Sequence, residues 1–397
     1  MIKQMFKLIW NRKRANALIM VEIFFSFLMI FAVAVASVYL YSNYSKPLGY
    51  EYENVWNIAV DARETRTERE SADLRDRMSR LVTELRTLDG VQSAAQVGFA
   101  PFDESVAENG IQHEGSRVYV QFNRGDAALD ETLDLEVVRG RWFNSSDASG
   151  ANGVVVIDED TARTFFDNAD PIGQKLISED EEEIVGGRIV GVIRDFRRND
   201  LEKENAYVFQ PISQRDPDQL LAGNILVRLP AGTRADFEEH LIARLQAMEP
   251  AWSFEVRPLE QLRDANLRLR LVPLMIGAIV ALFLSLTVAL GLMGVLWQNV
   301  TQRTREIGLR RAIGAPAKSV QSQIVGELLV LTSCSLLAGA IAVSQLPLIG
   351  MVTLPAGVFI TGLLISLGLI YLLAVSCALY PSWLASRVQP ALALRTD

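Results

Sequence analysis

The chain has 397 residues, of which half are hydrophobic, and a formal net charge of −8. Its apolar residues are gathered into long runs, which excludes an ordinary soluble multidomain protein of this length. The chain has only two histidines and two cysteines. These numbers argue against a zinc site, a histidine-based catalytic triad and a disulfide framework.

Four apolar runs are long enough, at about 20 residues each, to cross a bilayer. They predict transmembrane helices at residues 17–41, 271–298, 323–346 and 356–380. The basic residues outside 42–270 all flank these runs, so they form no patch for nucleic acid.

Short basic flanks stay in the cytoplasm, whereas long domains translocate largely regardless of charge. We therefore expect both termini, including the tail 381–397, and the loop 299–322 to be cytoplasmic. Residues 42–270 and the short apolar loop 347–355 are expected outside. Arg263, Arg268 and Arg270 depart from this rule, but they belong to the long domain.

Residues 1–16 place apolar side chains at helical spacing among basic ones, which predicts an amphipathic helix in the cytoplasmic interface. The alternative is a short basic topology signal. The run that follows resembles a signal peptide in its basic front. It is too long for one and lacks an Ala-x-Ala cleavage site, so we interpret it as a retained anchor.

The external domain begins and ends with a strand–helix–strand pattern. Residues 55–60 and 91–99 are predicted strands around a helix marked by Leu74, Met78, Leu81, Leu85 and Leu88. The pattern returns as strands at 225–229 and 253–256 around a helix. The two repeats predict a ferredoxin-like or porter-like α+β subdomain.

Residues 105–215 between these repeats are richer in short strands and turns. We predict strands at residues 117–122, 135–138, 154–157, 184–193 and 207–209, and a short helix at residues 159–166. This part is interpreted as a β-rich subdomain inserted into the first. Residues 259–269 are expected to be helical and continuous with the second span.

No Gly-Lys dipeptide occurs, so the sequence contains no Walker A loop, and no Gly-x-Ser-x-Gly elbow occurs either. Glu22 and Glu327 are the acidic residues inside predicted spans, where a carboxylate suggests a function such as proton coupling. Both lie near the cytoplasmic ends of their spans, where headgroups or a nearby arginine can neutralise them.

Four motifs follow one another along the chain. They are Arg139-Gly-Arg-Trp-Phe143, Pro171-Ile-Gly-Gln-Lys-Leu176 with Ile189-Val-Gly-Val-Ile-Arg-Asp-Phe196, Glu306-Ile-Gly-Leu-Arg-Arg-Ala-Ile-Gly-Ala315, and Tyr380-Pro-Ser-Trp-Leu-Ala-Ser-Arg387 with its continuation to Arg395. Together they resemble the MacB/FtsX family of ABC-transporter permeases. Outside the third motif, the resemblance is carried by Gly140, Pro171, Gly173, Gly191, Asp195, Phe196, Pro381, Arg387 and Pro390.

The resemblance implies that the third motif is the coupling helix that docks on a separate cytoplasmic ATPase. Apolar side chains there would make contact, arginines would pair with acidic residues, and the glycines would allow close approach. The implied coupling residues are Arg305, Glu306, Ile307, Gly308, Arg310, Arg311, Ala312, Gly314 and Ala315, with Ile313 beside them. A solvated cytoplasmic loop is the alternative.

The family also implies a non-catalytic permease subunit without its own ATPase domain, in the cytoplasmic (inner) membrane. It binds no cofactor; ATP and magnesium belong to the ATPase. A second permease, the same or different, is implied, together with a periplasmic adaptor and an outer-membrane channel. We expect extrusion of an amphiphilic peptide, lipid-linked molecule or toxic compound. Alternatives are a lipoprotein-release permease, a regulator of cell-wall hydrolases and, from another class, a membrane receptor.

Overall fold

The computed structural model describes residues 13–386 except for 63–67, 106, 114–115, 150–152, 168, 177–186, 202–205, 213–222, 234, 304–308, 310–312, 314–315 and 350–353. The predicted helix at residues 1–16 lies almost entirely outside the described residues. The chain divides into two compact units, residues 1–42 with 270–397 and residues 43–269.

The first unit contains long apolar helices. They are α2 (Lys13–Tyr44), α7 (Leu259–Gln302, of which the part from Arg270 belongs to this unit), α9 (Ala317–Leu348) and α10 (Ala356–Ser386). In the described part of the chain, these four helices are long and apolar enough to cross a membrane. The expected continuity is present, because α7 starts 12 residues before the predicted span at residue 271.

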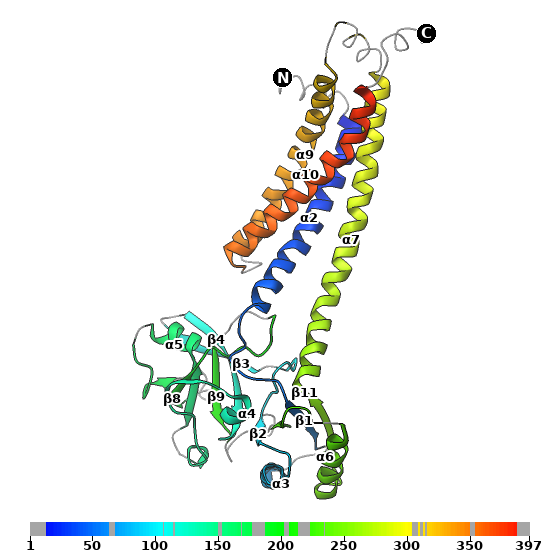
Figure 1. The fold of residues 1–397 in the computed structure, drawn as a ribbon. Coiled ribbons are helices and arrows are strands. Elements are labelled where there is room, and N and C mark those ends of the chain that lie inside the picture. The colour runs from blue at the N-terminus through cyan, green and yellow to red at the C-terminus, as the bar shows by residue number, and fades with distance from the viewer. Residues whose placement is uncertain are drawn as a thin grey trace. The chain divides into compact units, whose positions relative to one another are not determined.

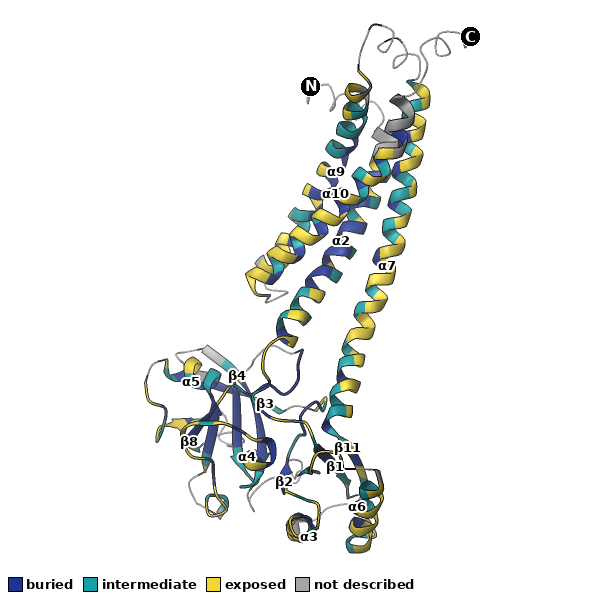
Figure 2. Ribbon diagram, in the orientation of Figure 1, coloured by how far each residue is buried: buried dark blue, intermediate teal, exposed yellow. Residues whose placement is uncertain are grey.

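Helix α2 packs closely on its three neighbours, and glycines permit this approach. A Cβ atom added at Gly339 of α9 or Gly362 of α10 would lie 2.4 Å from Phe27 or Val35 of α2. At Gly291 of α7 it would lie 2.8 Å from a carboxylate oxygen of Glu22. Much of the outward surface of α7 is apolar and exposed (Figure 2).

The second unit begins and ends with the predicted repeats (Figure 1). Strands β1 (Val55–Asp61), β2 (Ser93–Val97), β10 (Asn224–Arg228) and β11 (Ser253–Pro258) pair in the antiparallel order β11-β1-β10-β2. Helices α3 (Glu68–Arg86) and α6 (Ala235–Met248) join β1 to β2 and β10 to β11, and their apolar faces pack on these strands. This is the ferredoxin-like split β-α-β arrangement.

The insertion between β2 and β10 contains the remaining strands and two short helices. They are β3 (Ala107–His113), β4 (Ser116–Gly125), α4 (Leu129–Leu133), β5 (Val137–Gly140), β6 (Val154–Asp158), α5 (Glu159–Phe166), β7 (Lys175–Leu176), β8 (Gly187–Ile193) and β9 (Tyr207–Pro211). The predicted α+β fold with an inserted β-rich part is confirmed. Strands β3 and β7 and helix α4 were not predicted.

The insertion is continuous with the ferredoxin-like sheet, because β4 pairs with β2 at Val97 and Gly125. The sheet then continues in the order β4-β9-β6-β8-β5, with β3 on β4 and β7 on β8. Hydrogen bonds from the Gly98 N–H to the Arg124 carbonyl and from the Asp126 N–H to the Gln96 carbonyl flank the Val97–Gly125 pair. The two parts also share an apolar cluster, which contains Val97 and Leu226 as well as Val156 and Phe209.

Candidate functional site

Two of the predicted motifs meet at strand β8. Gly140 of β5 pairs with Gly191 of β8 in antiparallel register. A Cβ atom at Gly140 would lie 2.2 Å from the Val190 carbonyl oxygen, and one at Gly191 would lie 2.1 Å from the Arg141 carbonyl oxygen. Gly140 also has a φ of 71°, in the left-handed region. Both positions therefore require glycine for the two backbones to pass each other.

The Pro171 motif forms a turn against the same strand. The Gln174 N–H donates to the Pro171 carbonyl at 3.1 Å, and Gly173 has a φ of 83°. Gly173 is the third residue of this turn, a position where positive φ favours glycine. The Gly173 N–H then donates to the Ile189 carbonyl of β8 at 2.8 Å. The Arg139 and Pro171 segments thus both contact strand β8, which is part of a motif segment itself.

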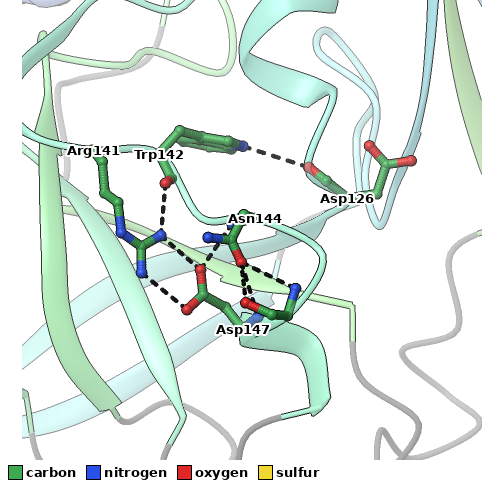
Figure 3. A network of polar contacts seen from close by, with 6 residues as sticks. Asp126, Arg141, Trp142, Asn144 and Asp147 are labelled. Carbon is green, nitrogen blue, oxygen red and sulfur yellow. Dashed lines mark hydrogen bonds and ion pairs between the residues drawn. The ribbon is translucent and has the colours of Figure 1, made fainter.

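The residue after Gly140 anchors the loop that follows β5 (Figure 3). Arg141 donates to both carboxylate oxygens of Asp147, at 2.7 and 3.0 Å, and to the Trp142 carbonyl at 3.0 Å. The hydrogen bond from Arg141 lowers the pKa of Asp147 below its usual value. Buried Trp142 stacks near Phe143, with ring centroids 4.3 Å apart. This network fixes the exit of β5.

The β8 motif ends with half-buried Asp195 and buried Phe196. Asp195 accepts two hydrogen bonds from Arg163 of α5, at 3.0 and 2.8 Å. Phe196 is buried, with its ring 4.9 Å from Tyr50 and 4.6 Å from Tyr207. The motif therefore directs the chain inward just before residues 197–201.

Residues 197–201 hold the end of helix α2. Arg197 donates to the Asn43 carbonyl at 2.9 Å and to the Lys46 carbonyl at 3.2 Å, and its backbone N–H donates to the Leu48 carbonyl at 2.9 Å. In return, the Asn43 side chain donates to the Leu201 carbonyl at 3.1 Å. Asn43 and Arg197 are both buried, so water competes little for these bonds.

The same segment holds the first turns of helix α7. Arg263 forms a two-point ion pair with Asp200, with both N–O distances at 2.8 Å. The Arg263 guanidinium also donates to the Tyr52 hydroxyl and lies over the rings of Tyr44 and Tyr52, 5.5 and 4.7 Å from their centroids. The Asp200 side chain is only 4% exposed. We call residues 43–52, 196–201 and 263 the clasp.

The clasp was not predicted from the sequence. Its only signals are the Arg-Arg-Asn-Asp run after Phe196 and the location of Arg263 on the unexpected side of the membrane. Pairing with Asp200 gives a physical reason for that location, since the positive charge is neutralised within residues 43–269. A cavity of ≈ 610 Å³ adjoins the clasp and is lined by residues that include Tyr44, Asp200 and Arg263.

The predicted coupling residues themselves, from Arg305 to Ala315, lie outside the described residues. Of the third motif the structure describes only Leu309 and Ile313, whose side chains are exposed. The Ile313 N–H donates to the Leu309 carbonyl at 3.1 Å, as in a helical turn. In the fourth motif, buried Pro381 lies within α10, and Arg387 and Pro390 are not described.

Comparisons with known proteins agree with this architecture. The profile of the MacB-like periplasmic core domain matches residues 17–243, more than half of the chain, and the FtsX-like permease C-terminal profile matches residues 278–390. The chain is 25% identical over 268 residues to a macrolide export ATP-binding/permease protein of Azoarcus sp., covering 66% of this chain and 40% of the relative.

A pyoverdine export ATP-binding/permease protein of Pseudomonas syringae is 28% identical over 228 residues, covering 54% of this chain and 33% of the relative. The chain thus spans well under half the length of these relatives. The crystal structure of the periplasmic region of MacB from Actinobacillus actinomycetemcomitans is 14% identical, with a TM-score of 0.39, and covers 54% of this chain and 93% of that one.

Proposed function

The chain belongs to the MacB/FtsX family of ABC-transporter permeases, and we propose that it transmits movement from a separate cytoplasmic ATPase to its residues 43–269. The movement would export an amphiphilic compound. The chain is an integral membrane protein with an extracytoplasmic domain, and both termini would lie in the cytoplasm.

The clasp is the observation that best supports this proposal. The outer end of α2 and the first turns of α7 are both fixed to one segment of the domain, through buried hydrogen bonds and the Arg263–Asp200 pair. Helix α7 is continuous over 44 residues, and Pro273 inside it removes one backbone hydrogen bond without ending the helix. A displacement at the cytoplasmic end of α7 would therefore reach the clasp without being absorbed in a flexible linker.

The contact with the ATPase would be made by the third motif. Leu309 and Ile313 are separated by one helical turn and are exposed, as apolar docking residues should be. Glu306, Arg310 and Arg311 supply charges of both signs for pairing with the ATPase. The relatives are named for macrolide and pyoverdine export, so a macrolide is a reasonable first cargo to assay.

Charge reversal in the third motif tests the proposal. The full chain carrying Glu306→Arg or Arg310→Glu is produced with its ATPase, and co-purification, ATP hydrolysis and resistance of a sensitive host to erythromycin are measured. We expect at least a tenfold loss of co-purified ATPase and loss of resistance, with the permease still folded. The control is Lys318→Glu, outside the motif. Unchanged co-purification and resistance would contradict the coupling assignment.

A further inference from the structure

The one acidic side chain within α9 is paired with the residue that follows α7. Arg303 comes directly after the last residue of α7, and its N–H still donates to the Asn299 carbonyl at 3.2 Å. Its Nη1 atom lies 3.0 Å from each carboxylate oxygen of Glu327. Gln323, one turn before Glu327 on α9, donates to the same carboxylate at 3.2 Å.

This group is partly withdrawn from solvent. The Arg303 and Glu327 side chains are 21% and 19% exposed, in contrast to the surface pair Arg194–Glu136, where both side chains are more than half exposed. An exposed pair contributes little, whereas a partly buried carboxylate that loses its cation keeps an uncompensated charge. The Arg303–Glu327 contact therefore holds the two helix ends together more firmly than a surface pair would.

The position of the ion pair in the chain allows it to connect α7 directly to α9. Arg303 directly follows α7, and Glu327 lies ten residues after the first residue of α9. The pair therefore joins the two sides of the segment that contains the third motif. With this contact, a force on the segment is shared between α7 and α9.

We infer that Arg303, Gln323 and Glu327 form a latch that makes α7 and α9 move as one body when the third motif is displaced. The latch consists of positioning residues and touches no substrate. It also gives Glu327 a role other than proton carriage, because both carboxylate oxygens are occupied by Arg303. The effect of the latch on export rests on the proposed function, but the contact between the two helices can be tested without an ATPase.

The first test measures the rigidity of the latch in the full chain. Spin labels are attached to cysteines at exposed Thr301 and Ser322, with the native Cys334 and Cys377 changed to serine. Double electron–electron resonance gives the distance distribution between them. We expect a narrow distribution for the parent chain, at least a twofold broader one for Glu327→Gln, and a narrow one again for the charge-swapped Arg303→Glu/Glu327→Arg.

The matched control is Glu136→Gln, which breaks an exposed pair in the domain and should leave the 301–322 distribution unchanged. The latch is contradicted if the 301–322 distance distribution of Glu327→Gln is as narrow as that of the parent. It is also overturned if the charge-swapped chain, recovered folded, remains as broad as Glu327→Gln, because the ion pair would then not be what sets the distance.

The second test separates the latch from the proposed function. In membranes containing the ATPase, Glu327→Gln is expected to keep ATP hydrolysis within twofold of the parent while erythromycin export falls at least fivefold, and the charge swap should recover export. Equal export by the parent and Glu327→Gln overturns the coupling role of the latch. If the parent neither engages the ATPase nor exports, the proposed function fails, while the label distances still decide whether the latch exists.

Discussion

At the scale of single residues, burial changes the acid–base chemistry of Asp158. It caps helix α5, and one carboxylate oxygen accepts hydrogen bonds from the Thr161 N–H at 2.9 Å, the Thr161 hydroxyl at 2.5 Å and the Tyr207 N–H at 3.2 Å. The residue is 1% exposed. Burial raises the pKa of Asp158 from 3.8 to about 7, and the hydrogen bonds only partly oppose this.

The raised pKa predicts how stability depends on pH around this carboxyl. The folded chain binds the Asp158 proton more tightly than the unfolded chain, so stability falls as pH rises from about 4 to 7. The slope from this group is at most about 1.4 kcal/mol per pH unit. Asp158→Asn keeps the accepting oxygen and cannot ionise, so this part of the slope should disappear.

Amide hydrogen exchange at Thr161 and Tyr207, corrected for intrinsic rates between pH 5 and 8, measures the effect. Protection should fall with rising pH in the parent and stay flat in Asp158→Asn. Asp160→Asn, at a half-buried position in the same helix turn, serves as the control. If the parent and Asp158→Asn show the same pH dependence, the buried carboxyl does not titrate in this range.

At the scale of elements, sequence periodicity located most strands and helices but could not locate the clasp. Helix α5 was predicted with its observed bounds, and the structure shows that the Asp158 side chain caps its first turn. Strand β3 was missed, since Ala-Glu-Asn-Gly-Ile-Gln-His alternates poorly and pairs only with β4 among the described strands. The clasp joins residues up to 211 positions apart through side-chain and loop contacts, which leave no period in the sequence.

The Arg263–Asp200 ion pair of the clasp should contribute more to the free energy of unfolding than a surface ion pair does. Arg263→Met leaves the Asp200 carboxylate, 4% exposed, without its cation, and breaking a buried pair in this way costs about 3–5 kcal/mol. We expect faster amide exchange in residues 43–52 and 196–201. The double variant Arg263→Met/Asp200→Leu should recover part of the loss, since no unpaired charge remains.

The comparison variant is Arg194→Met, which removes an exposed pair with Glu136 and should cost less than about 1 kcal/mol. Thermal unfolding and amide exchange of the full chain in detergent or nanodiscs provide both readouts. Equal effects of Arg263→Met and Arg194→Met would mean that the clasp does not hold the helix ends.

At the scale of the whole molecule, the sequence established the number of spans and the α+β character of the domain. These follow from the length of apolar runs and from two strand–helix–strand repeats, both of which are local patterns. The short junction at Val97 and Gly125 between the two parts of the sheet could not be foreseen, because one strand pairing of a single residue pair leaves no pattern in the sequence. The coupling motif was recognised by resemblance, and its role remains a prediction.

The central claim is that ATP binding by a partner ATPase displaces residues 43–269. This displacement can be measured as the distance between two spin labels. They are attached to cysteines that replace exposed Tyr119 of β4 and exposed Ser344 of α9, in a chain without Cys334 and Cys377. Labelled chain is diluted with unlabelled chain and bound to the ATPase, with and without a non-hydrolysable ATP analogue. We predict a shift of several ångström on nucleotide binding that Glu306→Arg abolishes; identical distributions with and without nucleotide would contradict the account.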